Sequence, residues 1–315
     1  MLSILRRIIA GRLGRLPILP RILTPTGCFL ILFGVLASHA EVPYPPDIKK
    51  IKDRGKIIVA QCRIQQPGFY WVVNDGTHLN EPFFQVKGKR FLGLDIAMAM
   101  KIAEELGVDL ELNQSSCDFN AVCLQVARGE ADIGISKLSI TLKRAQYIRF
   151  TRPYAQLGVG LLVNRYLEAR AGSKGSLWDM CNRPDTKIGV WKGTSWETYA
   201  QELFPKADIQ LYDSFDALFQ AVVDKKIFAC LDEDFGLRLK LHENPKAGLW
   251  ARFVQVPHKK DPIGIVVAPN SPNLLAFLNL FLEHRGVKFD MEALLRNTAK
   301  IRRIKLNTAQ NGSKK

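Results

Sequence analysis

Hydroxyl groups and an arginine are concentrated in one segment near the middle of the chain. The segment over residues 131–135 predicts a short buried strand, and it is followed by Ser136, Ser139 and Thr141 and then by Arg144. Small hydroxylated residues where a strand ends and a helix begins supply O–H and N–H donors that suit an anion. The Arg144 guanidinium adds a planar fork that can hold a carboxylate through two parallel hydrogen bonds. The pattern favours a carboxylate-binding site; the alternative is an ordinary helix cap beside a solvated arginine.

A second group of donors follows the predicted strand over residues 187–190. Gly193, Thr194 and Ser195 lie between this strand and a predicted helix over residues 195–204. Glycine lets the backbone approach a ligand, and the hydroxyls lie beside the positive end of the helix dipole. We expect Thr194 to contact an anion there, with a plain helix cap as the alternative.

Carboxylates end a third predicted strand, over residues 228–231. Asp232, Glu233 and Asp234 are adjacent, so their charges repel one another. An exposed acidic turn is one explanation. A carboxylate that points into a closed cleft would instead pair with an ammonium group, and the residues alone leave both explanations open.

The elements that would position these groups alternate between strands and helices. Predicted strands over residues 56–61, 109–112 and 131–135 are separated by predicted helices over residues 93–106 and 119–128. This βαβαβ order predicts a parallel sheet with helices on its faces. A second series of the same kind begins with the strand that precedes Thr194.

Two apolar strands, over residues 157–163 and 263–268, are expected to cross between two lobes. The chain after its leader is longer than one core usually supports, which favours two lobes. We expect an α/β fold with lobe 1 over residues 41–162, lobe 2 over residues 163–260 and a return to lobe 1 over residues 261–299. Two crossings form a hinge, with the ligand site in the cleft at the carboxyl ends of the strands.

The first 40 residues have the layout of a signal peptide. Five arginines and no acid accompany an apolar run over residues 28–37, and small residues follow it. The run is too short to span about 30 Å of hydrocarbon. Removal of residues 1–40 would lower the net charge from +15 to +10. We expect export to the periplasm, and a basic, disordered tail over residues 300–315.

Five cysteines follow the predicted leader, an odd number that leaves at least one thiol free. Cys117 and Cys123 flank a helix start and are a candidate disulfide pair in an oxidising compartment. Cys62 and Cys230 lie at apolar strand ends, where we expect buried thiols.

Several motifs in order place the chain near a known family. From Gly129 it reads Gly-Glu-Ala-Asp-Ile-Gly-Ile-Ser-x-Leu-Ser-Ile-Thr-x-x-Arg-Ala, followed by Phe150-x-x-Pro153-Tyr154. This pattern resembles the periplasmic solute-binding proteins of polar amino acid ABC transporters, over about residues 50–295. The resemblance implies a two-lobed type 2 periplasmic binding fold that closes over one amino acid and delivers it to a membrane permease.

The resemblance also implies roles for single residues. Ser139 and Arg144 match the residues that hold the ligand's α-carboxylate, and Thr194 matches a contact on the second lobe. Glu233 falls where the family has an aspartate that binds the α-amino group. Because glutamate is one methylene longer, Asp232 is the alternative. The full set of expected ligand contacts is Arg63, Phe69, Ser136, Lys137, Ser139, Arg144, Gly193, Thr194, Asp232 and Glu233.

A long loop over residues 63–90 is expected to shape the side-chain end of the pocket. Phe69 or Tyr70 matches an aromatic that stacks on the ligand in many family members, with core packing as the alternative. Arg63 lies near the point where relatives that prefer glutamate or aspartate carry an arginine, and Lys137 would add a second cation. An acidic amino acid is therefore the ligand we expect, unless these two cations are solvated.

The histidines, serines and cysteines form no pattern typical of a nucleophilic or metal-dependent enzyme. We expect a monomeric binding protein without metal or cofactor. We expect no nucleic acid partner either, because the basic tail has no aromatic stacking platform. The alternative is a periplasmic dehydratase acting on a cyclic amino acid, with Glu233 or Asp232 as general acid.

Overall fold

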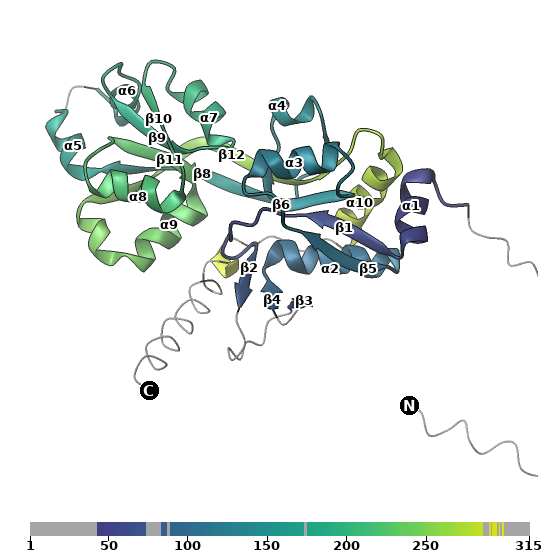
Figure 1. Cartoon of the computed structure of the whole chain (residues 1–315). Coiled ribbons are helices and arrows are strands. Elements are labelled where there is room, and N and C mark those ends of the chain that lie inside the picture. The colour runs from purple at the N-terminus through teal and green to yellow at the C-terminus, as the bar shows by residue number, and fades with distance from the viewer. Residues whose placement is uncertain are drawn as a thin grey trace, which may run out of the picture. The chain divides into compact units, whose positions relative to one another are not determined.

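The computed structural model describes residues 43–73, 83–86, 89–172 and 175–285, together with positions 290, 292–294, 296 and 298 (Figure 1). The predicted signal peptide over residues 1–40 and the predicted tail over residues 300–315 lie outside the described residues. Among the described residues, no helix combines the length and the apolar character that crossing a bilayer requires.

The strands and helices alternate along most of the described chain. The strands are β1 (Lys56–Ala60), β2 (Trp71–Val73), β3 (Phe84–Val86), β4 (Lys89–Leu92), β5 (Asp109–Asn113), β6 (Ile133–Ser139), β7 (Arg149–Phe150), β8 (Ala155–Asn164), β9 (Lys187–Trp191), β10 (Asp208–Tyr212), β11 (Ala229–Glu233) and β12 (Ala251–Val267). The helices are α1 (Pro46–Arg54), α2 (Leu94–Leu106), α3 (Phe119–Ala127), α4 (Leu142–Ala145), α5 (Arg165–Arg170), α6 (Leu177–Cys181), α7 (Trp196–Leu203), α8 (Phe215–Val223), α9 (Asp234–Glu243), the 3-10 helix η1 (Pro245–Leu249) and α10 (Pro272–His284).

A nine-stranded sheet connects the two lobes. Its strand order is β10-β9-β11-β8-β12-β6-β1-β5, with β7 paired to β12. Strand β1 is parallel to β5 and β6, and β9 is parallel to β10 and β11. The central strands β8 and β12 are antiparallel to each other and to their other partners. The fold is therefore two-lobed α/β as predicted, and β8 and β12 are the two crossings (Figure 1).

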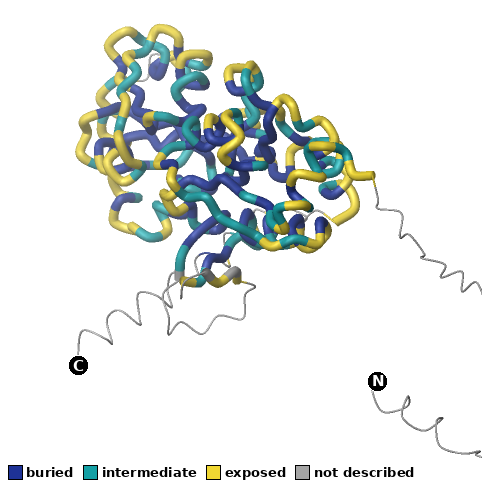
Figure 2. The backbone as a smooth tube through the Cα atoms, turned by 45° about the vertical axis from the view of Figure 1, so that its right-hand side comes forward, coloured by how far each residue is buried: buried dark blue, intermediate teal, exposed yellow. Residues whose placement is uncertain are grey.

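Each half of the sheet has an apolar core, and a third cluster of buried residues includes residues from both halves. Ile57 of β1 and Ile133 of β6 pack with Ile102 of α2 in one half, and Val190 of β9 packs with Ala200 of α7 in the other. Burying an isoleucine or valine side chain contributes about 1.5–3 kcal/mol. Figure 2 shows the buried residues along the interior strands and the exposed residues on the outer turns. These cores fix the strand ends that carry the candidate site.

The crossing strands β8 and β12 lie so close together that one of them needs glycine. A Cβ atom added at Gly160 would overlap the Phe253 ring, and the β8–β12 register shifts between Gln255 and Lys260. This contact explains Gly160, whereas a Cβ atom added at Gly158 would overlap the side chains of Asp234 and Gln255. The lobe boundaries at residues 162 and 260 fall within these two strands and stay a prediction.

Two local predictions were wrong. Strand β6 continues to Ser139 because β12 pairs with it that far, so Ser136 and Ser139 lie inside the strand and not after it. The segment over residues 63–90 is also not one loop. It contains β2 and β3, which both pair antiparallel with β4. Runs of three residues are too short to show a strand period.

The cysteine predictions had mixed outcomes. All five described cysteines are free thiols, and Cys117 is exposed whereas Cys123 is buried, so the candidate disulfide is not formed. Cys62 and Cys230 are buried at strand ends, as predicted.

Candidate ligand-binding site

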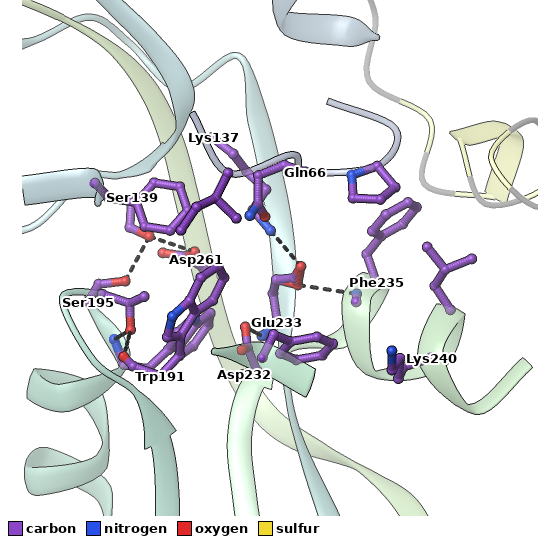
Figure 3. Close-up of a pocket in the computed structure, with 18 of the residues that line it drawn as sticks. Gln66, Lys137, Ser139, Trp191, Ser195, Asp232, Glu233, Phe235, Lys240 and Asp261 are labelled. Carbon is purple, nitrogen blue, oxygen red and sulfur yellow. Dashed lines mark hydrogen bonds and ion pairs between the residues drawn. The ribbon is translucent and has the colours of Figure 1, made fainter. Parts of the chain in front are cut away.

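A cavity of about 390 Å³ lies where the carboxyl ends of strands from both lobes meet (Figure 3). Strand β6, the loop before β2 and helices α3 and α4 line one side, and β9, β11, the starts of α7 and α8 and the length of α9 line the other, with β12 between them. Its lining residues are Ile64, Gln65, Gln66, Pro67, Phe119, Lys137, Ser139, Arg144, Trp191, Thr194, Ser195, Trp196, Ser214, Phe215, Asp216, Asp232, Glu233, Phe235, Gly236, Leu239, Lys240, Glu243 and Asp261.

Arg144 is buried at one end of this cavity, so the alternative of a solvated arginine is wrong. The side chain of Thr141 caps the short helix α4 by accepting the Arg144 N–H at 3.3 Å. The Arg144 guanidinium donates from Nε to Asn120 Oδ1 and from Nη1 to the Ser139 carbonyl, both at 3.1 Å. Nη2 has no hydrogen-bond partner among the described residues. The guanidinium is thus held in place with one nitrogen left for a ligand.

A chain of hydroxyl groups joins the two lobes beside Arg144. Ser195 Oγ donates to Ser139 Oγ at 2.8 Å, and Ser139 Oγ donates to Asp261 Oδ2 at 2.9 Å (Figure 3). Tyr199 donates its hydroxyl to the other Asp261 oxygen at 3.2 Å. Ser195 starts α7 but its side chain makes no cap bond, which leaves it free for this contact.

Asp261 is a central residue of the site that the sequence did not reveal. It is almost fully buried in β12, and burial raises the pKa of its carboxyl to about 6 although Ser139 and Tyr199 donate to it. A single aspartate between two lysines and a proline carries no motif. Its place just before Pro262, at the start of the predicted return crossing, is the signal that could have found it.

Thr194 also lines the cavity, whereas its neighbour Gly193 does not. The Thr194 hydroxyl donates to the Trp191 carbonyl at 2.5 Å and accepts the Trp196 N–H at 3.3 Å. Gly193 has a φ of +77°, which favours glycine, and its N–H donates to Glu197 Oε1 at 2.6 Å. The turn therefore orients Thr194 and Ser195 towards the cavity.

The opposite part of the cavity is acidic. Asp232 and Glu233 are each 4% exposed, so the explanation of an exposed turn is wrong for both. The Glu233 carboxylate accepts the Lys137 ammonium at 2.7 Å and the Gly236 N–H at 3.3 Å, which caps α9. Burial, followed by the adjacent Glu233 charge, raises the pKa of Asp232 well above its ordinary value.

Lys137 points towards this acidic end because its backbone conformation is unusual for a strand. Its φ is +48°, and β6 pairs with β12 with a register shift opposite it. Such irregularities redirect a side chain, and a non-glycine residue with positive φ costs of order 1–3 kcal/mol. Burial lowers the pKa of the Lys137 ammonium, but the carboxylates of Glu233 and Asp232 outweigh it, so the pKa lies above its ordinary value.

Three of the other expected contacts do not line the cavity. Arg63 is exposed. Phe69 is fully buried and packs edge-on against Phe235, with 6.1 Å between the ring centres. It therefore packs in the core, which was the alternative to stacking on the ligand. Ser136 accepts the Cys62 N–H at 3.0 Å. The aromatic lining comes instead from residues that sequence reasoning did not single out, namely Phe119, Trp191, Trp196, Phe215 and Phe235.

The cavity thus has a cationic, hydroxyl-rich end and an acidic end. A zwitterion has the complementary distribution of charge, and aromatic walls exclude water from a buried ligand. Within the described part of the chain, no group of three or more histidine, cysteine, aspartate or glutamate residues is placed to hold a metal ion.

A two-lobed α/β fold with an interlobe cavity of this chemistry defines a periplasmic-type binding protein. The family model of the bacterial extracellular solute-binding proteins, family 3, matches residues 74–294, and the chain belongs to this family.

Individual relatives are distant. The chain is 25% identical over 185 residues to the L-cystine-binding protein TcyJ of Escherichia coli K12, which covers 58% of this chain and 61% of that protein. It is 23% identical over 211 residues to the ABC transporter arginine-binding protein 1 of the same organism, covering 66% of this chain and 82% of that protein. Among solved structures, the amino acid ABC transporter substrate-binding protein AbpA from Streptococcus pneumoniae, bound to L-arginine, is 24% identical with a TM-score of 0.60. That match covers 80% of this chain and 98% of AbpA, and it shows the fold alone.

Proposed function

We propose that this protein captures one amino acid in the interlobe cavity, in the periplasm, and delivers it to the permease of an ABC transporter. The observation that carries the proposal is the position of Arg144. Its guanidinium is buried, braced by Asn120 and Ser139, and has Nη2 directed to no described residue. A braced arginine loses little conformational freedom when it binds a carboxylate.

The other groups around the cavity complete the recognition of a zwitterion. The hydroxyls of Ser139 and Ser195 come from different lobes and lie beside the arginine, where they can contact the same carboxylate. The buried carboxylate of Glu233 lines the same cavity, with Asp232 beside it, and suits the ligand's ammonium group. A ligand that contacts both ends would hold the lobes together, as expected of a hinge protein.

The charge of the lining changes our expectation for the ligand's side chain. The acidic ligand expected from the sequence rested on Arg63, which is exposed and outside the lining, and on Lys137, which already pairs with Glu233. The cavity is lined by five acidic residues and three basic ones. We therefore propose that neutral or cationic amino acids bind better than glutamate or aspartate, because like charges in a buried site repel. Two relatives are named as cystine-binding and arginine-binding proteins, and a preference for neutral or cationic amino acids agrees with those names.

A thermal-shift screen of the twenty amino acids and cystine, followed by calorimetry, tests the proposal. A ligand at a hundred times its dissociation constant stabilises the folded protein by about 2.7 kcal/mol. We expect arginine, lysine, histidine, cystine or glutamine to raise the melting temperature more than glutamate and aspartate do. A stronger response to glutamate or aspartate would contradict the charge argument, and no response to any of them would contradict the proposed function.

A dehydratase is the second candidate, and Asp261 is the observation that favours it. Its carboxyl lines the cavity and has a pKa raised by burial to about 6, close to what a general acid needs near neutral pH. Mass spectrometry of the ligand after incubation with the protein separates the two functions. Loss of one water from the ligand would establish the enzyme, and an unchanged mass of a ligand that binds would contradict it.

A further inference from the structure

The ion pair between Lys137 and Glu233 connects the two lobes. Lys137 belongs to β6 and Glu233 to β11, and Nζ lies 2.7 Å from Oε1. Their side chains are 13% and 5% exposed, so water screens the pair weakly. Figure 3 shows both side chains in the cavity, with the dashed contact between them.

Neighbouring residues fix Lys137 in this position. Its backbone N–H leaves the sheet and donates to Asp95 Oδ2 at 2.9 Å, and Tyr154 holds the other Asp95 oxygen at 2.7 Å. Its Nζ also lies 5.7 Å from the centre of the Phe69 ring, an attractive cation–π distance. A lysine on a solvated surface needs none of these contacts, so the fold directs this ammonium group into the cavity.

We propose that Lys137 is a tethered competitor of the ligand, whose ammonium group binds the same Glu233 carboxylate that the ammonium group of an amino acid requires. This inference rests on the proposed function. An incoming amino acid displaces Nζ from Glu233, and Nζ then donates a hydrogen bond to Asp232, which lines the same cavity next to Glu233. The exchange replaces the ion pair between Lys137 and Glu233 with an ion pair between the ligand and Glu233, with no change in covalent structure.

Competition for Glu233 has a recognisable signature. Every α-amino acid carries the ammonium group, so removing the competitor should tighten the binding of all of them. A general electrostatic effect of removing one cation would instead tighten cationic ligands and weaken anionic ones. The two explanations therefore differ in their prediction for glutamate.

The test is calorimetry of Lys137→Met with arginine, glutamine and glutamate. The matched control is Lys56→Met, because Lys56 pairs with Glu111 and both residues lie outside the cavity lining. We expect Lys137→Met to lower the dissociation constant at least tenfold for each of these amino acids that the wild type binds. We expect Lys56→Met to stay within about threefold of the wild type for glutamine, since a partly exposed pair contributes little. Unchanged or weaker binding by Lys137→Met would overturn the inference.

Two further variants keep the test decisive. Lys137→Gln retains a hydrogen-bonding side chain and replaces Lys137→Met if that protein does not fold. Glu233→Gln combined with Lys137→Met should lose the gain in affinity, because the contested carboxylate is gone. If neither the wild type nor Lys137→Met binds any amino acid, the proposed function fails. If the wild type binds and Lys137→Met gains nothing, only the competitor fails.

Discussion

At the scale of single residues, the site depends on buried acids that are held by donors from other elements. Asp95 is the clearest case, because it lies outside the cavity and yet positions Lys137. Burial raises the pKa of its carboxyl to about 7, and the donors Tyr154 and Lys137 counteract this only in part. The charged form of Asp95 therefore costs the folded protein stability near neutral pH.

The pH dependence of unfolding tests this account of Asp95. An acid with a raised pKa in the folded state contributes stability that is fully present below its unfolded pKa, near 4, and is lost as pH rises through the folded pKa. The wild type should therefore lose up to about 4 kcal/mol relative to Asp95→Asn between about pH 4 and pH 8. Urea unfolding of both proteins measures the difference, and a difference that does not change with pH would contradict the raised pKa.

Some of these residues could be found from the sequence, and others could not. Ser139, Arg144 and Thr194 belong to short local motifs, and the structure places all three in one cavity. Asp261 has no such motif, because its role depends on Ser139, which lies 122 positions away. Arg63 was expected in the pocket from its approximate position in a loop, and position alone does not determine where a side chain points.

At the scale of elements, the crossing strands β8 and β12 carry the connection between the lobes. Their close packing at Gly160 leaves no room for a methyl group beside the Phe253 ring. The alternation of strands and helices along the chain could be predicted because buried strands and amphipathic helices have strong periods. The β2–β4 sheet and the extension of β6 could not, because both depend on pairing with distant strands.

Gly160→Ala tests the packing of the crossing. The added Cβ must displace Phe253 or the backbone, so we expect a loss of about 1–3 kcal/mol in the free energy of unfolding. Gly248→Ala is the matched control, since a Cβ there meets nothing within 4 Å and we expect a change within about 0.5 kcal/mol. Equal stability of the two variants in urea would show that the crossing is not tightly packed at this point.

At the scale of the whole molecule, one cavity uses groups from both lobes and from the crossing strand β12. Arg144 and Ser139 line one side, Ser195 and Asp232 the other, and Asp261 lies on β12 between them. A ligand that satisfies all of these groups must contact both lobes at once. Such a ligand favours the closed arrangement of the lobes because it binds that arrangement more tightly than the open one.

Calorimetry of Arg144→Ala measures the central claim most directly, with the amino acid that stabilises the wild type most. Truncating one partner of a buried charge pair costs about 2–5 kcal/mol, or roughly 30-fold to several-thousand-fold in affinity. Arg149→Ala is the control, because Arg149 is an exposed arginine in the same segment and lies outside the cavity lining. We expect Arg144→Ala to fold and to bind at least about 30-fold more weakly, while Arg149→Ala binds like the wild type. Unchanged affinity in a folded Arg144→Ala protein would contradict the proposed role of Arg144.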